Sequence, residues 1–237
     1  MGMGKSGYVN KPTSSAEKFT VFNSYEGSQK WFNNPDLSNS STWPGELTPE
    51  EKQAVGSYTG TGYGTVNSEL YNVPWEEMSS KQKEKAANIY NALNKFELKK
   101  GITVTRQSDF QIFGASEYSK MTVDEVKNYL SGTKGIVQND GFLSTSANNK
   151  GAAIEGSGLV VTYHIPPSKG AGAYVNPISH NAGSYENEFL INNNAVFKFD
   201  VNSIHMGSDG KIHATAEWLG QAKNQSLIKK SKKKKGS

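Results

Sequence analysis

Hydrophobic residues recur at helical spacing in the first part of the chain and at strand spacing in the rest. The clearest helical pattern covers residues 79–96. Its apolar positions repeat at intervals of three and four residues, which places them on one helix face: Ala86, Ile89, Tyr90, Leu93 and Phe96. Three further helices are predicted: residues 28–32, 48–57 and 122–130. The last of these begins with Thr122 as its N-cap and Glu125 as its capping-box partner.

From Gly101 onward the pattern changes to short strands, separated by turns rich in glycine, asparagine and proline. The predicted strands are residues 102–106, 141–144, 158–165, 173–175, 188–191, 195–201 and 211–218. Because helices come first and strands follow, the expected fold is an α+β domain in which N-terminal helices pack on antiparallel sheets.

The two ends of the chain differ in composition from its body. Residues 1–17 are polar and rich in glycine, serine and lysine, so we expect a flexible N-terminal segment. Residues 18–222 are the predicted globular domain, and residues 223–237 a disordered lysine-rich tail. Six lysines within residues 229–235 carry a charge of +6. Because the net charge of the whole chain is +4, the rest of the chain carries a net charge of −2. A contact with acidic lipid, a localisation signal and a plain solvated tail all fit these lysines.

Composition limits the class of protein. Of the 237 residues, 35% are hydrophobic and 11% aromatic, which is enough apolar content for one well-buried domain. No run of about 18 apolar residues occurs, so no transmembrane segment is predicted, and no signal peptide is visible in this chain. There are no cysteines and the four histidines lack metal-binding spacing, so neither disulfides nor a metal site are expected. The nearly neutral body, with scattered lysines, predicts no nucleic-acid groove.

Three short motifs contain residues that suit one chemistry. Arg106 is the only arginine in the chain, and its planar guanidinium lies in a strand-like segment where it can bind a phosphate through two parallel hydrogen bonds. Residues 144–146, Ser-Thr-Ser, supply short hydroxyls that can orient a carboxylate. Glu186 and Glu188 place two carboxylates on one face of an extended strand, because side chains alternate along a strand. Together the motifs can hold a dinucleotide and act on it.

Each motif alone also has an ordinary interpretation as an edge-strand cation, a polar strand end or a pair of solvent-facing carboxylates. Their order and spacing, 38 residues from Arg106 to Ser144 and 42 from Ser144 to Glu186, make the combination specific. With these motifs the chain resembles the mono-ADP-ribosyltransferase toxins of the Arg/Ser-Thr-Ser/Glu-x-Glu type. That group includes the enzymatic components of clostridial binary toxins.

The resemblance extends upstream of the arginine and covers residues 19–218. Tyr58, Tyr63 and Asn67 match the run that precedes the arginine in this family, although Tyr58 fits a core position equally well. The resemblance implies a core of two roughly perpendicular antiparallel sheets with an NAD cleft between them. It also identifies residues 18–222 as an ADP-ribosyltransferase catalytic domain.

The resemblance implies a role for each motif residue. Arg106 contacts the phosphate of NAD, and Ser144 hydrogen-bonds Glu188 and helps to place the nicotinamide ribose. Glu188 stabilises the oxocarbenium-like cation formed when nicotinamide leaves, and Glu186 orients an arginine acceptor and takes its proton. The implied NAD-binding set is Arg106, Gln107, Ser144, Thr145, Ser146, Tyr58, Tyr63, Asn67 and Glu188. Tyr185 and Glu186 are the implied contacts with the target protein.

The leading hypothesis is an arginine-specific mono-ADP-ribosyltransferase that uses NAD as co-substrate, needs no metal and acts as a toxin or effector. Its expected partner is a target protein with an exposed arginine, and the resemblance most often implies actin. We expect a monomer that is secreted or translocated into a host cell, with a separate delivery component, and acts in the cytosol. The alternatives are an NAD glycohydrolase with water as acceptor, a phage-borne transferase acting inside a bacterial host, and a binding module without turnover.

Overall fold

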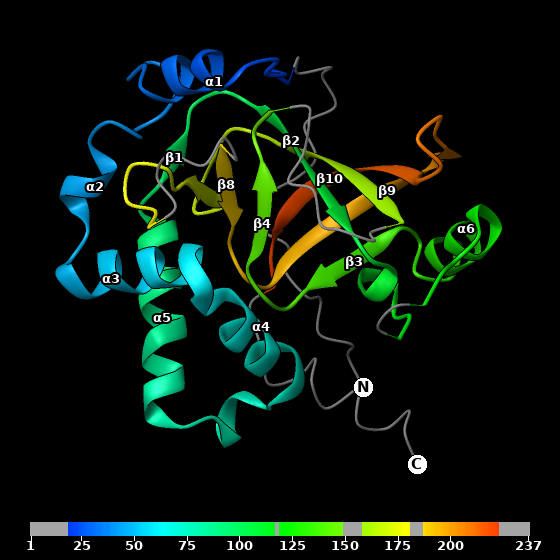
Figure 1. The fold of residues 1–237 in the computed structure, drawn as a ribbon, viewed down its shortest axis with the longest axis horizontal. Coiled ribbons are helices and arrows are strands. Elements are labelled where there is room, and N and C mark those ends of the chain that lie inside the picture. Colours follow the sequence, from blue (N-terminus) through cyan, green and yellow to red (C-terminus); the bar gives the residue numbers. More distant parts are fainter. Residues whose placement is uncertain (1–18, 117–118, 149–157, 181–186, 223–237) are drawn as a thin grey trace, which may run out of the picture.

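The computed structural model describes residues 19–116, 119–148, 158–180 and 187–222 (Figure 1). Tyr185 and Glu186 lie outside these residues, as do the predicted N-terminal segment and the lysine-rich tail. No helix in the described ranges is both long and apolar enough to cross a membrane.

Helices form the first part of the described chain. The α-helices are α1 (Tyr25–Phe32), α2 (Trp43–Glu46), α3 (Pro49–Ser57), α4 (Tyr63–Asn72), α5 (Ser80–Asn94) and α6 (Val123–Gly132). Shorter helical turns are the π-helical η1 (Tyr58–Gly62) and the 3-10 turns η2 (Trp75–Glu77) and η3 (Phe110–Phe113). Helices α3, α5 and α6 each begin with a reciprocal capping box, which satisfies backbone N–H groups at the helix start. The capping box predicted for Thr122 and Glu125 is confirmed.

Helix α4 is not predicted by the sequence pattern, and its burial explains why. Only Val66 and Leu70 among its 10 residues are buried, whereas Tyr63 and Tyr71 are exposed. An apolar stripe wide enough to be recognised is therefore missing. The helix is placed instead by its packing against η1 and α5.

Eight strands form the main sheet, in the order β3-β9-β10-β5-β2-β4-β8-β7. Their bounds are β2 (Ile102–Ser108), β3 (Ile136–Asn139), β4 (Leu143–Ser146), β5 (Leu159–Ile165), β7 (Gly172–Tyr174), β8 (Glu188–Ile191), β9 (Ala195–Met206) and β10 (Ile212–Gln221). Two short strands, β1 (Glu97–Leu98) and β6 (Ser168–Lys169), pair separately. Every strand predicted from the sequence is present, and β1, β3 and β6 are additional.

The main sheet consists of two parts that meet between β2 and β4. These two strands share a single registered pair, Thr105 with Ser146. In Figure 1, β4 and β8 run in a different direction from β2, β9 and β10. The α+β class is confirmed, while the two expected sheets are two parts of one continuous sheet. One pair also departs from the antiparallel expectation, because the second strand of the β9–β10 hairpin inserts beside β5 and runs parallel to it.

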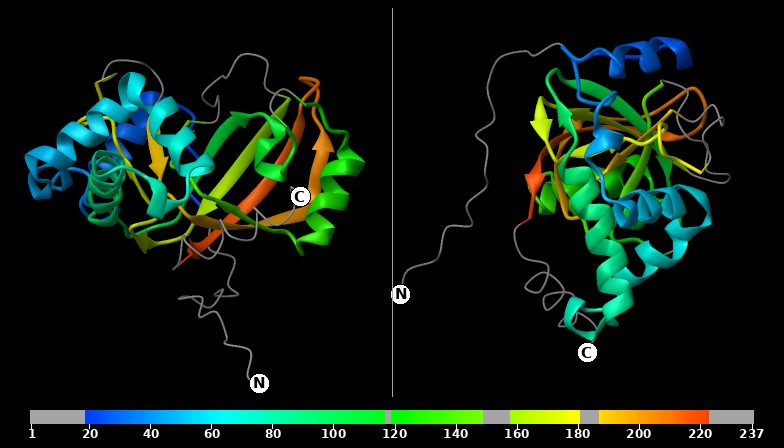
Figure 2. Two further views of the ribbon diagram at one scale, coloured as in Figure 1. Left: turned by 90° about the horizontal axis from the view of Figure 1, so that it is seen from below. Right: turned by 90° about the vertical axis from the view of Figure 1, so that its left-hand side faces the viewer.

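The helices cover the sheet at its two ends (Figure 2). Helices α1 to α5 gather around the β4-β8-β7 part, whereas α6 packs on β9 at the far end. An aromatic cluster joins the N-terminal helices to the strands, and in it the ring of Phe32 stacks on Tyr174 at a centroid distance of 4.2 Å. Phe96 and Phe189 pack edge to face beside them. This cluster anchors α1 against β7 and β8, the strand that begins at Glu188.

Candidate active site

Arg106 and the Ser-Thr-Ser run lie together where β2 meets β4. Arg106 Nη1 donates a hydrogen bond to the carbonyl oxygen of Ser144 at 2.7 Å. The neighbouring residue Thr105 is paired with Ser146 in the sheet. The guanidinium of Arg106 on β2 therefore binds the main chain of β4. This contact joins the arginine motif and the Ser-Thr-Ser motif, although they are far apart in the sequence.

Strand β8 brings Glu188 to the same unit. Pairing of β4 with β8 sets Ser146 opposite Glu188 and Ser144 opposite Leu190. Thr145, on the other face, donates its hydroxyl to the carbonyl oxygen of Phe189 at 2.5 Å, and its expected contact with NAD stays a prediction. The residue directly across from Glu188 is thus Ser146, one position along the same face from Ser144. The expected hydrogen bond between Ser144 and Glu188 stays a prediction.

Tyr58 and Asn67 support the start of β4. The amide of Asn67 donates to the carbonyl oxygen of Phe142 at 2.9 Å, and Asn67 Oδ1 accepts from the Phe142 N–H at 3.0 Å. The hydroxyl of Tyr58 donates to the same carbonyl oxygen at 3.2 Å and accepts from Asn67 Nδ2 at 3.0 Å. Tyr58 is 1% exposed, so it occupies the core position considered for it. A contact between either residue and NAD stays a prediction.

Replacing Asn67 with alanine is expected to lower the free energy of unfolding by about 1–3 kcal/mol, because the Phe142 N–H loses its side-chain partner in a part-buried place and the Phe142 C=O keeps only the Tyr58 hydroxyl. Denaturant unfolding measures this loss. Asn72→Ala is the control, since Asn72 lies on the same helix but its amide only contacts the carbonyl of Ser68 at the exposed surface. Equal losses in the two variants would contradict the supporting role.

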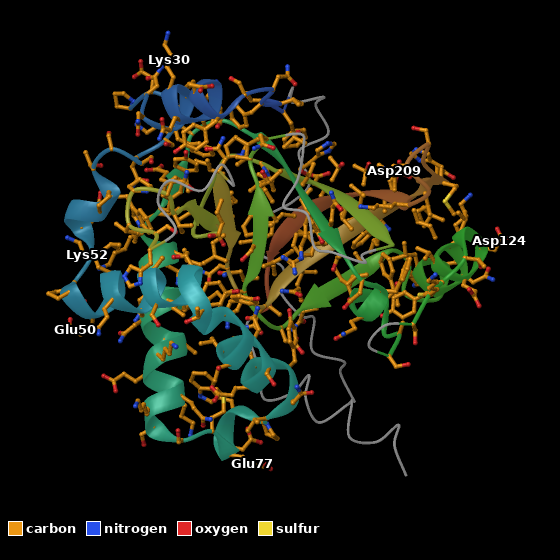
Figure 3. The ribbon with its side chains drawn as sticks, in the orientation of Figure 1. Lys30, Glu50, Lys52, Glu77, Asp124 and Asp209 are labelled. Carbon is orange, nitrogen blue, oxygen red and sulfur yellow. The ribbon has the colours of Figure 1, made fainter. Side chains whose placement is uncertain are left out.

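Arg106 is a half-buried cation with no local counter-charge in the described part of the chain. Within those ranges no carboxylate oxygen lies within 4.0 Å of it, and its buried Nε has no hydrogen-bond partner. By contrast, the charged side chains of Lys30, Glu77 and Asp209 lie at the rim of the molecule (Figure 3). A buried polar atom without a partner is costly, so this guanidinium is suited to an anionic ligand.

Arg106 and Glu188 both influence the hydroxyl groups of nearby tyrosines, and these hydroxyls are buried even where, as in Tyr71, part of the side chain is exposed. Burial raises the pKa of Tyr58 above its usual value; the charge of Glu188 adds to this shift, and the charge of Arg106 opposes it. Burial also raises the pKa of Tyr71 and of Tyr163, and in both cases Arg106 opposes the shift. These hydroxyls therefore stay protonated at neutral pH, and Tyr58 keeps the proton that it donates to the main chain.

Two other predicted NAD contacts have different surroundings. Tyr63, at the start of α4, is 58% exposed. Gln107 projects from the opposite face of β2 to Arg106, and its Oε1 accepts from Lys211 Nζ. Within the described residues, no group of three or more His, Asp or Glu side chains is placed to hold a metal ion.

The segment before the Glu-x-Glu motif borders a polar pocket. This pocket has a volume of about 360 Å³ and lies between α1, the segment that follows it and the end of β7. Asn176 lines the pocket and also accepts the N–H of Glu188 at 3.0 Å. Farther along the same segment, the His180 N–H donates to Thr59 Oγ1 at 3.3 Å. This hydrogen bond connects the segment to η1.

The sequence interpretation overlooks Asn176 and Asn187, which hold the backbone beside Glu188. Asn187 adopts a positive φ and is completely buried. The one sequence signal for Asn187 is its residue type, because asparagine tolerates the left-handed region of φ and ψ better than most residues. The loop contains several asparagines, however, and this signal alone does not select one of them.

Comparison with known sequences agrees with this geometry. A sequence model described as ADP-ribosyltransferase exoenzyme matches residues 30–233, which is most of the chain. The chain therefore belongs to the ADP-ribosyltransferase exoenzyme family and is a transferase. It is 29% identical over 178 residues to the NAD(+)–arginine ADP-ribosyltransferase EFV of Enterococcus faecalis. The match covers 72% of this chain but 33% of that relative, so the chain spans about a third of its length.

Solved structures show the same fold. Plx2a, an ADP-ribosyltransferase toxin from Paenibacillus larvae, has a TM-score of 0.68 and 26% identity, over 85% of this chain and 100% of that one. BECa, the ADP-ribosylating toxin of a C. perfringens binary enterotoxin solved with NADH, has a TM-score of 0.67 and 26% identity, over 85% and 50%. The C3 exoenzyme of Clostridium limosum has a TM-score of 0.66 at 18% identity, over 86% and 98%.

Proposed function

We propose that this protein transfers ADP-ribose from NAD to an arginine side chain of a target protein and releases nicotinamide. The observation that carries the proposal is the joining of Arg106, the Ser-Thr-Ser run and Glu188 by the pairing of β2, β4 and β8. This arrangement brings the Arg106 guanidinium and a nearly buried carboxylate into one group of neighbouring strands. The similarity to a relative named as an arginine ADP-ribosyltransferase supports the arginine acceptor.

In the proposed reaction Arg106 binds a phosphate of NAD, and Glu188 accepts a hydrogen bond from the 2′-hydroxyl of the nicotinamide ribose. The bond between ribose C1′ and the nicotinamide nitrogen breaks, and its electron pair leaves with nicotinamide. Glu188, 9% exposed, stabilises the positive charge that develops on the ribose. Ser146 and Ser144 lie along the same face of β4 and orient this carboxylate.

The acceptor arginine is expected at Glu186 and Tyr185. A guanidinium is fully protonated at neutral pH, so its attack on C1′ requires a group that orients it and takes a proton as the new C–N bond forms. Glu186 supplies that group in the proposed mechanism. Tyr185 stacks on the target beside it. Actin is the first target to test, on the resemblance to binary-toxin enzymes, with the protein acting in the cytosol of a target cell after secretion or delivery by a separate component.

Labelled NAD incubated with the protein and with peptides that contain arginine, lysine, glutamine or asparagine tests the acceptor. Label on the arginine peptide alone is the expected result. Nicotinamide release without label on any peptide would instead support the alternative, an NAD glycohydrolase with water as acceptor. The same assay on host-cell and bacterial lysates separates a toxin from a phage-borne enzyme that acts inside a bacterium.

Replacing Arg106 with lysine is expected to weaken NAD binding by about 1.5–3 kcal/mol, roughly 10- to 150-fold in Kd, because lysine keeps the charge but loses the planar two-bond fork. Calorimetric titration measures this change. Arg106→Gln is the matched comparison, since it removes the charge as well and is expected to bind still more weakly. A folded lysine variant that binds NAD as tightly as the parent would make Arg106 a structural residue.

A further inference from the structure

Asn187 lies between the two glutamates of the motif, and none of its surface is exposed. Its backbone φ is 49°, in the left-handed region that few residues other than glycine, asparagine and aspartate adopt. Strand β8 begins at the next residue, Glu188. The turn that leads into this strand therefore needs a residue that tolerates the left-handed conformation.

The side chain of Asn187 uses both ends of its amide. Nδ2 donates to Ser28 Oγ of α1 at 2.5 Å, and Oδ1 accepts from the hydroxyl of Tyr174 in β7 at 2.8 Å. The main-chain oxygen of Asn187 accepts from the N–H of Ala147, directly after β4, at 2.9 Å. Three separate elements thus hold this one residue. Nδ2 also donates to the carbonyl oxygen of Tyr25 at the longer distance of 3.4 Å. Because the amide is buried, the loss of either short contact weakens the pairing of a buried polar group.

The backbone of Glu188 is held just as closely. Its N–H donates to Asn176 Oδ1 at 3.0 Å, and its carbonyl oxygen accepts from the Val175 N–H at 3.1 Å. Pairing with Ser146 sets its register in the sheet. These contacts hold the backbone of Glu188 from the strand side, and the turn at Asn187 holds it from the other side.

We propose that Asn187 is a positioning residue, whose buried amide ties α1 and β7 to the turn and so fixes the Glu188 carboxylate relative to the ribose of NAD. This inference rests on the role proposed above for Glu188. A charge that stabilises a transition state has to be held within about 0.5 Å of its productive position. Helix α1 thereby contributes to turnover through Ser28, although Ser28 acts only by way of Asn187.

Three variants test this proposal. Asn187→Gly keeps the left-handed backbone accessible and removes the amide. Ser28→Ala removes the nearer of two α1 acceptors of Asn187 Nδ2 and leaves the carbonyl oxygen of Tyr25, at 3.4 Å. Ser38→Ala is the matched control, since Ser38 is equally buried and its hydroxyl donates to the carbonyl oxygen of Phe32 instead, at 2.6 Å. Nicotinamide release, NAD binding and amide hydrogen exchange are measured for each folded variant.

We expect Asn187→Gly to lower kcat for nicotinamide release by about 10- to 100-fold while Kd for NAD changes by less than about threefold, because the carboxylate is displaced but the phosphate site is intact. Ser28→Ala is expected to show a smaller loss of the same kind, and Ser38→Ala none. Amide exchange at Ala147 and Glu188 is expected to accelerate in the first two variants only.

A folded Asn187→Gly variant that releases nicotinamide with the kcat of an active parent overturns the proposal. A loss of kcat in Ser38→Ala that equals the loss in Ser28→Ala also overturns it. Failure of the proposed function has a different signature. If the parent releases nicotinamide without modifying arginine, the acceptor assignment is wrong, and nicotinamide release still decides the role of Asn187. A parent that releases no nicotinamide refutes both, whatever the exchange rates at Ala147 and Glu188.

Discussion

Replacing Glu188 with glutamine is expected to reduce both ADP-ribose transfer and NAD hydrolysis by about 100- to 1,000-fold, the usual effect of losing one preorganised electrostatic contact. Glutamine keeps the size of the side chain and its place opposite Ser146, but it carries no negative charge. Both reactions pass through the same cleavage of the bond between nicotinamide and ribose. A group that stabilises this step must therefore affect both rates equally.

The two rates are measured in one preparation, as nicotinamide release with and without an arginine acceptor. Glu217→Gln is a suitable control, because Glu217 lies exposed on β10 and the substitution removes the same charge. Titration with NAD shows whether the Glu188 variant still binds its substrate. A Glu188→Gln protein that hydrolyses NAD at nearly the parental rate would exclude Glu188 from the cleavage step.

The sequence predicts the elements of this fold well wherever one period dominates. Helix α5 has a regular apolar stripe, and its start is marked by Ser79, so the pattern over residues 79–96 identifies it. Strand β5 alternates between buried and half-buried residues along its whole length. By contrast, strand β3 is not predicted, because its two buried positions are Val137 and the polar Asn139, so no alternation of apolar and polar residues marks it.

Strand pairing is less accessible to a sequence argument, because it depends on contacts between distant segments. The motifs identify Arg106 and Glu188 as candidates, but only the pairing order shows that β4 lies between their strands. The same order sets Ser146, not Ser144, directly across from Glu188. Side-chain periodicity specifies which face a residue occupies and leaves its cross-strand partner open.

The residues that support the site are the hardest to predict. Asn187 is a single asparagine of the kind common in turns, and Asn67 is named by the family resemblance only as an NAD contact, not as a support for β4. Their importance comes from partners that lie 75 and 159 residues away in the sequence, Phe142 and Ser28. The local pattern of polar and apolar residues does not indicate hydrogen bonds between such distant residues. Catalytic motifs are therefore recognisable in this chain, whereas the groups that position them require the structure.

Replacing Glu186 with glutamine is expected to lower arginine modification by about 100-fold or more, the range for removal of a general base. NAD hydrolysis should stay within about threefold of the parent, because the departing nicotinamide does not need this carboxylate. Glutamine can still contact a guanidinium through its amide oxygen, but it can neither balance the positive charge of the acceptor nor take up its proton. The variant is thus expected to become an NAD glycohydrolase.

Glu188→Gln provides the comparison for this result, since it removes one charge from the same motif two positions away. The ratio of transfer to hydrolysis is the decisive quantity, because a general loss of folded protein lowers both rates and leaves their ratio unchanged. Glu186→Gln should lower the ratio, while Glu188→Gln should preserve it. If both substitutions lower the two rates in parallel, Glu186 serves NAD cleavage or folding, and the arginine must be activated by another group.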